Sequence, residues 1–348
     1  MTARTVALDN KVIGPGHPCY LVAEVGTTSR GDMEKALKLV EAGARAGVDA
    51  VKFQLIDPEQ LSDPSVKFSF KIRERTYRAN MKRMFQRLYF TEEEWRTIAA
   101  ACRAAGVHFF ATVDHLSGVD LLERVGVPAH KMGAWDSTYR PLVEHIARTG
   151  KPLFFDLGPT TQEELAEVVD WFRTAGGRSL LFMHDFHTDE DREMNLAVIR
   201  YLNATYPWPA GFSSPARDDD LDMAALALGA HHIEKRLILS RSERAFHAHE
   251  SVEPDELKAW VARIRHVERA LGLERLMPST KDREQSACYY RSVCTLRPVK
   301  VGEVFTPHNL GGKRPGTGLA TARIKEIWGR TATRDLDVNT LLTEADFA

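Results

Sequence analysis

The chain has 348 residues, of which 43% are hydrophobic and 27% charged, and its formal net charge is −1 at pH 7. This composition is typical of a globular protein with one large domain, alone or followed by a small second one. The balanced charge argues against a broad nucleic-acid surface, and no apolar run approaches the roughly 20 residues that span a bilayer.

The N-terminus and the cysteines predict the compartment. Residues 1–10, MTARTVALDN, lack the apolar core of a secretion signal. Cys19, Cys102, Cys288 and Cys294 share no metal-type spacing and are typical of reduced thiols. We therefore expect a cytoplasmic protein.

Residues 20–54 predict a strand, a helix and a second strand. The apolar runs YLVAE and DAVKFQ carry Glu24, Lys52 and Gln54 at their ends. A carboxylate, an ammonium and an amide at the same end of two parallel strands indicate a catalytic face, because charged groups inside apolar runs are costly to desolvate. The alternative is that they are ordinary polar residues at strand ends.

Six further apolar runs follow, and helical patterns separate most of them. The runs cover residues 108–113, 129–134, 152–158, 179–184, 209–214 and 231–237. Eight strand–helix units in about 250 residues predict a (β/α)8 TIM barrel. A doubly wound open sheet is the second choice, and it is disfavoured because no GxGxxG motif follows the first strand.

A barrel brings the carboxyl ends of its strands to one mouth. The polar residues at these ends include cations and carboxylates, which suits an anionic substrate and proton transfer. The set comprises Glu24, Lys52, Gln54, Thr112, Lys131, Asp156, His184, Ser213, Ser214, Glu234 and Arg236. Some of these side chains could instead point into the barrel core or form structural pairs.

A long segment, residues 56–90, separates the second and third strands, and its second half is basic. We expect a loop that serves as a lid or a subunit contact at the barrel mouth. Its charge could steer an anion inward. The alternative is a solvated helix face.

The C-terminal part predicts a second domain. A helical pattern at 253–272 closes a barrel domain of residues 1–272, and the polar, non-periodic stretch 273–288 predicts a linker. Residues 289–348 contain short β-like runs punctuated by Gly and Pro. Arg314 lies in the loop RPGTG, which taken alone predicts a surface turn.

Nearly the whole chain resembles the sialic acid synthase (N-acetylneuraminate synthase) family. The segments that carry the resemblance include AEVGTTSRGDMEKALKLVEAGARAGVDAVKFQ, HFFATVD, GVPAHKMGAWD, LGAHHIEKR and KVGEVFTPHNLGGKRPGTGL. The resemblance implies a TIM barrel followed by a small antifreeze-like (SAF) β-rich domain. It also implies an enzyme that joins phosphoenolpyruvate to an N-acyl sugar aldehyde.

The resemblance implies roles for particular residues. Glu24, Lys52 and Lys131 match family residues at the phosphoenolpyruvate site, where two ammonium groups can hold a phosphate and a carboxylate. Thr112 matches the family threonine of the third strand. Gln54 is similar to a glutamine that contacts the sugar.

Further substrate contacts follow from the same resemblance. Arg314 matches an arginine that reaches the sugar's N-acyl group from the partner subunit of a homodimer, so a dimer is expected. Asp136 stands near a family glutamate, and His247 near a family aspartate. Together with Ser213 at the end of the seventh strand, these residues complete the expected substrate-binding set.

Several positions depart from the family pattern. The family binds a divalent metal, typically manganese, through two histidines, and this chain has Pro215 and Arg236 at those positions. Neither can ligate a metal, so we assign no metal ligand and leave the cofactor open. Asp156 replaces a serine near the phosphate, and a carboxylate there repels phosphate unless it is protonated or paired.

Four other histidines could rebuild a metal site. His184 and His187 follow the sixth strand, and His247 and His249 follow the eighth. With Asp156 or Asp185 they offer metal-type ligands. The alternative is that they are solvated loop histidines.

Three functions stay open. The first is the family condensation, with Arg236 as a fixed cation in place of the metal. The second is a different reaction on a non-phosphorylated acid, suggested by Asp156. The third is a non-catalytic homologue that binds sugars or a partner, which the retained Glu24, Lys52 and Lys131 disfavour.

Overall fold

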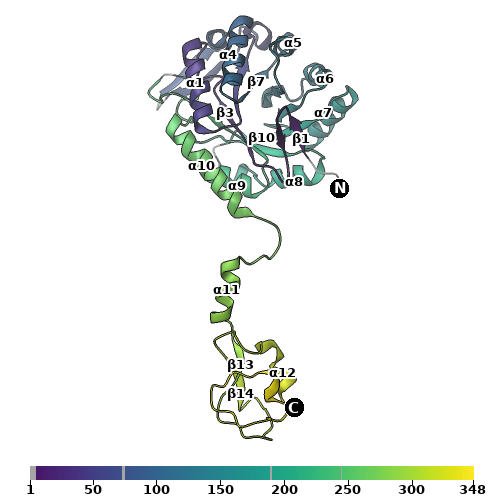
Figure 1. The fold of residues 1–348 in the computed structure, drawn as a ribbon. Coiled ribbons are helices and arrows are strands. Elements are labelled where there is room, and N and C mark those ends of the chain that lie inside the picture. The colour runs from purple at the N-terminus through teal and green to yellow at the C-terminus, as the bar shows by residue number, and fades with distance from the viewer. Residues whose placement is uncertain (1–4, 73–74, 189, 244) are drawn as a thin grey trace. The chain divides into compact units, whose positions relative to one another are not determined.

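The computed structural model describes residues 5–72, 75–188, 190–243 and 245–348. The chain divides into two compact units, Met1–Gly272 and Leu273–Ala348 (Figure 1). Residues 1–4, at the start of the segment used above to predict the compartment, lie outside the described residues. So do residues 73–74 of the basic segment.

Eight parallel strands form a closed barrel in the first unit, with the order β10-β11-β12-β3-β4-β7-β8-β9. Every predicted run contains one strand, so the TIM-barrel prediction is confirmed and the open sheet is excluded. The strands are β3 (Tyr20–Glu24), β4 (Ala50–Leu55), β7 (His108–Val113), β8 (His130–Met132), β9 (Leu153–Asp156), β10 (Leu180–His184), β11 (Ala210–Ser213) and β12 (His232–Arg236).

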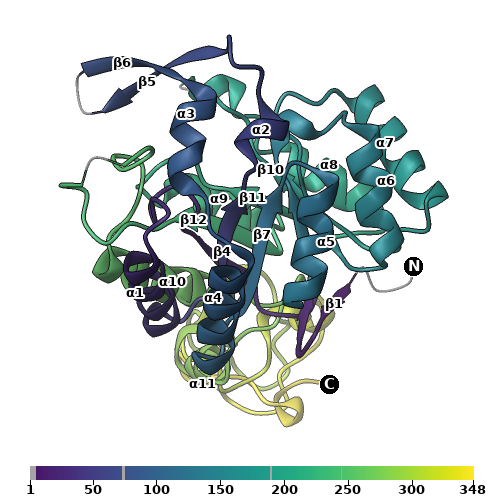
Figure 2. The same ribbon diagram turned by 90° about the horizontal axis from the view of Figure 1, so that it is seen from above.

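Helices surround the strands (Figure 2). Their apolar faces pack on the barrel, and Thr91 and Thr161 begin two of them with capping boxes. The helices are α1 (Met33–Ala46), α4 (Glu92–Ala104), α5 (Leu116–Val125), α6 (Arg140–Thr149), α7 (Gln162–Thr174), α8 (Val198–Thr205), α9 (Asp220–Ala227) and α10 (Pro254–Leu271). A short hairpin, β1 (Val6–Leu8) with β2 (Lys11–Ile13), precedes the first barrel strand.

The segment 56–90 is not the loop that we expected. It contains the antiparallel hairpin β5 (Lys67–Ile72) and β6 (Arg75–Asn80), flanked by helices α2 (Pro58–Leu61) and α3 (Met81–Phe85). The alternation of polar and apolar letters in KFSFKI is the period-two signal of a strand.

The second unit has a core of its own. Strands β13 (Ser292–Thr295) and β14 (Leu310–Lys313) pair antiparallel, and helix α12 (Ile324–Ile327) packs nearby. Its buried residues are Val293, Val299, Phe305, Leu310, Ile327, Ala332, Leu336, Leu342 and Phe347.

Part of the stretch 273–288, predicted to be a linker, forms helix α11 (Thr280–Tyr289), which the sequence did not predict; the linker itself stays a prediction. A capping box between Ser279 and Asp282 begins the helix. None of its described residues is buried, and the helix therefore lacks the apolar periodicity by which we recognise helices.

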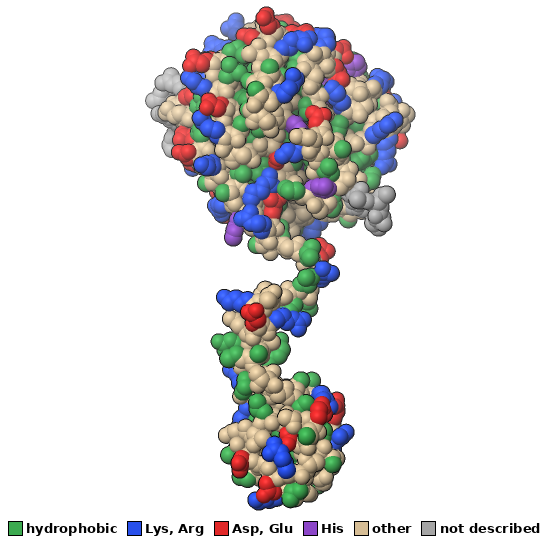
Figure 3. Space-filling view, viewed as in Figure 1, with side chains coloured by type: hydrophobic (Ala, Val, Ile, Leu, Met, Phe, Trp, Pro, Cys, Tyr) green, Lys and Arg blue, Asp and Glu red, His purple; other side chains and the backbone are tan. Residues whose placement is uncertain are grey.

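The surface charges and the cysteines give little further indication of function. Basic and acidic side chains are interspersed on the face that Figure 3 shows. Within the described ranges, none of the helices is both long and apolar enough to cross a membrane. Cys19, Cys102 and Cys294 are buried free thiols, and Cys288 is an exposed one.

Strand β12 divides three consecutive charged residues between two environments. Glu234 and Arg236 line a cavity inside the barrel mouth. Lys235 points the other way, because successive side chains of a strand alternate. Its Nζ lies 2.7 Å from Asp222 Oδ2 and 3.0 Å from Ser214 Oγ. Ser214 therefore takes part in a buried structural hydrogen bond and is not among the described residues that line the barrel mouth, where the sequence predicted it.

We predict that Lys235→Met lowers the free energy of unfolding by about 3–5 kcal/mol, because it leaves the fully buried Asp222 carboxylate without its cation. Lys38→Met is the matched control, since Lys38 pairs with Glu34 on the surface, and it should leave the free energy of unfolding nearly unchanged. Urea unfolding measures both. Equal losses in the two variants would contradict this account.

Candidate functional site

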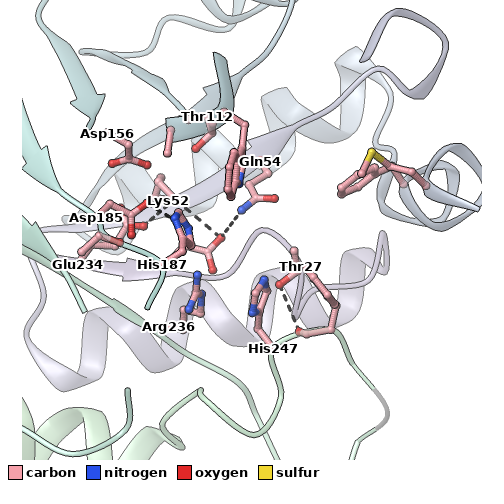
Figure 4. Close-up of a pocket in the computed structure, with 18 residues that line it drawn as sticks. Thr27, Lys52, Gln54, Thr112, Asp156, Asp185, His187, Glu234, Arg236 and His247 are labelled. Atoms are coloured by element: carbon pink, nitrogen blue, oxygen red, sulfur yellow. Dashed lines mark hydrogen bonds and ion pairs between the residues drawn. The ribbon is translucent and has the colours of Figure 1, made fainter. Parts of the chain in front are cut away.

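A cavity of about 330 Å³ opens at the carboxyl ends of the barrel strands. It combines carboxylates, cations and a few apolar side chains, and Figure 4 shows its polar residues turned toward one another. The described lining residues are Glu24, Thr27, Lys52, Gln54, Met81, Phe85, Thr112, Gly133, Ala134, Trp135, Asp156, Asp185, His187, Ser213, Glu234, Arg236, Phe246 and His247.

One buried carboxylate joins two lysines at the floor of the cavity. Glu234 Oε1 accepts a hydrogen bond from Lys52 Nζ at 2.7 Å, and Glu234 Oε2 accepts one from Lys131 Nζ at 2.8 Å. Burial alone would raise the pKa of Glu234, but the charges of Lys131 and Lys52 outweigh it and lower the pKa to about 2. Glu234 is therefore ionised at neutral pH and holds both ammonium groups in place.

Asp156 adds a second carboxylate to Lys131. Its Oδ1 lies 3.0 Å from Lys131 Nζ as an ion pair, without the geometry of a hydrogen bond. Burial raises the pKa of Asp156 to about 7, since the attraction of Lys131 only partly offsets the burial and the repulsion by Asp185 and Glu234. The side chain thus gains or loses its charge near neutral pH.

Glu24 is held at the end of β3 by its neighbours. Its Oε1 accepts hydrogen bonds from the Gly26 backbone N–H at 2.8 Å and from Gln54 Nε2 at 3.3 Å, and it lies 3.9 Å from Lys52 Nζ. Its Oε2 has no hydrogen-bond partner within the described part of the chain. The buried carboxylate keeps one acceptor for a ligand or a proton.

Glu250 anchors two cavity residues at the opposite side. Its Oε2 lies 3.0 Å from Arg236 Nη1 and 2.6 Å from His247 Nδ1. An ionised carboxylate only accepts, so the hydrogen lies on Nδ1 and a neutral ring keeps Nε2 as an acceptor. Burial and the charge of Arg236 lower the pKa of His247, which favours that neutral ring.

His247 has a backbone φ of 61°, a left-handed conformation that is uncommon outside glycine. Such strained residues concentrate at functional sites, where the surrounding contacts impose the conformation. Here the hydrogen bond between His247 Nδ1 and Glu250, together with Ser251 Oγ donating to the His247 carbonyl at 2.8 Å, fixes the ring beside Arg236.

An aromatic pair borders the cavity. The rings of Trp135 and His187 stack with centroids 5.1 Å apart, and the Trp135 residue is 74% exposed. Both also line a neighbouring cavity of about 270 Å³. Sequence reasoning missed Trp135, although an aromatic residue directly after a barrel strand is a signal that could have found it.

The cavity contains seven of the ten predicted catalytic and substrate-binding residues. They are Glu24, Lys52, Gln54, Thr112, Ser213, Arg236 and His247. Lys131 lies beneath the cavity, 1% exposed, and reaches the site through Glu234. The roles of all these residues stay predictions.

The other two predicted residues are Asp136 and Arg314. Asp136 is not among its described lining residues, and burial together with the charge of Asp114 raises the pKa of Asp136 to about 6. Arg314 belongs to the second unit, where its Nε donates to the Tyr289 carbonyl at 2.8 Å. Sequence reasoning missed Glu250, because it follows β12 in a loop without any pattern.

The residues present do not fit a metal ion. Pro215 and Arg236 stand at the family's ligand positions and cannot ligate. The described residues contain no group of three or more His, Cys, Asp or Glu side chains arranged for a metal. The relocated site does not form: His184 Nε2 lies 2.6 Å from the Met194 carbonyl, and the His249 side chain is 71% exposed.

Comparison with known proteins agrees with this architecture. A model of the NeuB family matches residues 39–275, about two thirds of the chain, and a model of the SAF domain matches residues 290–348. The chain belongs to the NeuB family. The resemblance to sialic acid synthases and the antifreeze-like second domain are thereby confirmed.

Several relatives are synthases by name. The chain is 29% identical over 334 residues to a pseudaminic acid synthase of Campylobacter jejuni, covering 94% of this chain and 96% of the relative. It is 26% identical over 329 residues to an N,N'-diacetyllegionaminic acid synthase of Campylobacter jejuni, covering 93% and 98%. These names support an enzymatic role.

Solved structures share the fold. The crystal structure of an N-acetylneuraminic acid synthetase from Leptospira borgpetersenii has a TM-score of 0.71 and 24% identity, covering 81% of this chain and 95% of that chain.

We predict that Asp156→Asn stabilises the protein more at pH 8.5 than at pH 5.5. The folded-state pKa of Asp156, about 7, exceeds the ordinary value of 3.8. Its contribution to stability is therefore fully present below pH about 4 and is lost as the pH rises through about 7, on the order of a few kcal/mol. Thermal unfolding of both proteins across this range measures the difference, and a difference that shrinks toward high pH would contradict the assignment.

Proposed function

We propose that the chain forms a carbon–carbon bond between a three-carbon acid, phosphoenolpyruvate or a related acid, and a sugar-derived aldehyde, without a metal ion. Membership of the NeuB family and the synthase names of its relatives support this class of reaction. The observation that carries the proposal is the convergence of Glu24, Lys52 and Arg236 on one cavity. Asp156 favours a second candidate, a reaction on a non-phosphorylated acid.

Lys52 is the residue that holds the acid. Its ammonium lines the cavity, and its one close carboxylate partner is Glu234 at 2.7 Å, while Glu24 is more distant at 3.9 Å. A lysine has three N–H donors, so donors remain for the carboxylate of a substrate. A charge-assisted hydrogen bond in a buried site is strong enough to orient the acid.

Arg236 takes the part that a metal would have in polarising the aldehyde. Bond formation turns the aldehyde oxygen into an alkoxide, and a fixed guanidinium stabilises that charge where it develops. Arg236 Nη1 donates a hydrogen bond to Glu250 Oε2 at 3.0 Å, and this bond fixes the position of the guanidinium. His247 presents its Nε2 as an acceptor for a sugar hydroxyl beside it.

Glu24 handles the proton or the water of the reaction. With phosphoenolpyruvate, C3 of the enol attacks the aldehyde carbon and water adds at C2, so that phosphate leaves. The Oε2 atom of Glu24, which has no partner within the described residues, can accept the proton of that water. Gln54 and the Gly26 N–H hold the other oxygen in place.

We predict that the reaction survives a chelator and depends on Arg236. Product formation from phosphoenolpyruvate or pyruvate with N-acyl hexosamines is followed by mass spectrometry, with and without EDTA. Arg236→Met should lower kcat by about 100-fold or more, the cost of losing one fixed donor at an oxyanion.

The matched control for this experiment is Arg241→Met. Arg241 follows the same strand but pairs with Glu256 outside the cavity, so its loss should leave kcat within about twofold. Complete loss of activity in EDTA would overturn the metal-free mechanism. An active Arg236→Met enzyme would overturn the role of Arg236.

The resemblance further supports a homodimer in which Arg314 of the partner subunit completes the sugar site. Arg314 lies on a Gly/Pro-rich loop of the SAF unit. A two-fold dimer would use each loop once.

We predict that two inactive variants, Glu24→Gln and Arg314→Ala, restore activity when their subunits are mixed by co-expression. In the mixed dimer one site carries both substitutions and the other carries neither. Random pairing makes about half of the dimers mixed, so about a quarter of the wild-type activity should return. Separately tagged subunits allow the mixed dimer to be purified, and an inactive mixed dimer would contradict the shared site.

A further inference from the structure

The charges around the cavity are unfavourable for a donor with several negative charges. The described lining residues include four carboxylates, Glu24, Asp156, Asp185 and Glu234, and two permanent cations, Lys52 and Arg236. Buried Lys131 adds a third cation beneath them. Three cations against four carboxylates leave a net charge of −1 when all are ionised. A phosphate ester with a carboxylate would enter a site that is already negative.

Lys131 has little capacity left for a substrate anion. Its ammonium donates to Glu234 Oε2 at 2.8 Å and to Met183 Sδ at 3.1 Å, and Asp156 Oδ1 lies 3.0 Å away. The ammonium thus uses two of its three N–H donors in hydrogen bonds, and a second carboxylate lies in contact with it. Two carboxylates already compensate its single charge, and Lys131 is not among the described residues that line the cavity.

Lys52 differs from Lys131 in both respects. It lines the cavity, and its second carboxylate, Glu24, lies 3.9 Å away instead of 3.0 Å. The two lysines are thus unequal. Lys52 is accessible to a ligand in the cavity, whereas the ammonium of Lys131 is covered by the carboxylate of Asp156. Asp156 accounts for this difference, because Glu234 lies at nearly the same distance from both ammonium groups, 2.7 Å from Lys52 Nζ and 2.8 Å from Lys131 Nζ.

We propose that Asp156 is a specificity-determining residue that occupies the place of the donor's second anionic group, so that the donor is an unphosphorylated three-carbon 2-oxo acid. This inference rests on the proposed function, which left the donor open. The acid is held through its one carboxylate by Lys52. Asp156 supplies, from the protein, the negative charge that a phosphate would bring to Lys131.

The reaction of such a donor balances without a further reactant. Glu24 removes a proton from C3 of the 2-oxo acid, and the resulting enolate attacks the aldehyde carbon. One C–H bond breaks and one C–C bond forms. The aldehyde oxygen, beside Arg236, becomes an alkoxide and takes the proton that Glu24 accepted. No group leaves, so the product contains every atom of both substrates.

The protonation of Asp156 tunes this discrimination. The charged groups that face it are Lys131 from β8, Lys52 from β4, Glu234 from β12 and Asp185 directly after β10. The two carboxylates favour its neutral form and the two lysines favour its charged form. Above neutral pH the charged form prevails, so a test at pH 8 examines the protein with its built-in anion present.

The experiment compares pyruvate and phosphoenolpyruvate as probes on the full chain at pH 8, by calorimetric titration and by product formation with N-acyl hexosamines. Wild type should bind pyruvate more tightly than phosphoenolpyruvate. Asp156→Ser should bind phosphoenolpyruvate at least 10-fold more tightly than wild type does, with pyruvate affinity changed less than threefold. Asp185→Asn is the matched control, because it removes one cavity carboxylate that does not pair with Lys131.

The outcomes separate the two proposals. Wild type that prefers phosphoenolpyruvate, or an Asp185→Asn variant that gains as much affinity as Asp156→Ser, overturns the role of Asp156 and leaves the proposed function standing. Wild type and variant that bind neither acid and form no product overturn the proposed function itself. If Asp156→Ser unfolds, Asp156→Asn replaces it, since the amide keeps the shape of the side chain and removes only its charge.

Discussion

The site depends on one buried carboxylate, Glu234, that holds two lysines from different strands. Without it, the ammonium groups of Lys52 and Lys131 would be two like charges in a buried space, where neither charge is screened by water. Desolvating three charged groups is costly, and the hydrogen bonds of 2.7 and 2.8 Å offset that cost. This cluster of Glu234, Lys52 and Lys131 constrains the positions of the other charged groups in the cavity.

Strand alternation explains how Glu234 comes to this position. Glu234 and Arg236 are two residues apart and share the inner face of β12, while Lys235 between them pairs with Asp222 on the outer face. These three consecutive charged residues do not pair with one another, and each has different partners: Glu234 has Lys52 and Lys131, Lys235 has Asp222, and Arg236 has Glu250. The alternation of side chains along a strand determines on which face of β12 each residue lies. The closure of the barrel determines which residues it pairs with.

The barrel could be predicted from the sequence because its signals are local. Each strand is a short apolar run, and several runs end in polar residues that line the cavity, among them Glu24, Ser213 and Arg236. Glu24, Lys52 and Gln54 were found in this way. Helix α11 was not predicted, because none of its described residues is buried and its apolar letters show no strong periodicity.

The partners within the site could not be predicted, because they depend on distances between segments far apart in sequence. Glu250 follows β12 by fourteen positions from Arg236, and nothing in the letters indicates that it binds both Arg236 and His247. Likewise, the replacement by Asp156 indicated a repulsive charge near a phosphate. Only the structure shows that this charge compensates Lys131.

The two departures from the family pattern are linked by charge. Arg236 puts a fixed cation where the family has a metal ligand, and Asp156 puts a fixed anion near Lys131. In the view of Figure 4 these residues lie on opposite sides of Lys52. In the mechanism proposed above, Arg236 supplies the cation for the developing alkoxide, and Asp156 supplies the anion beside Lys131. Counted as side chains alone, Arg236 in place of a neutral histidine adds one positive charge and Asp156 in place of a serine adds one negative charge, so the two replacements offset each other.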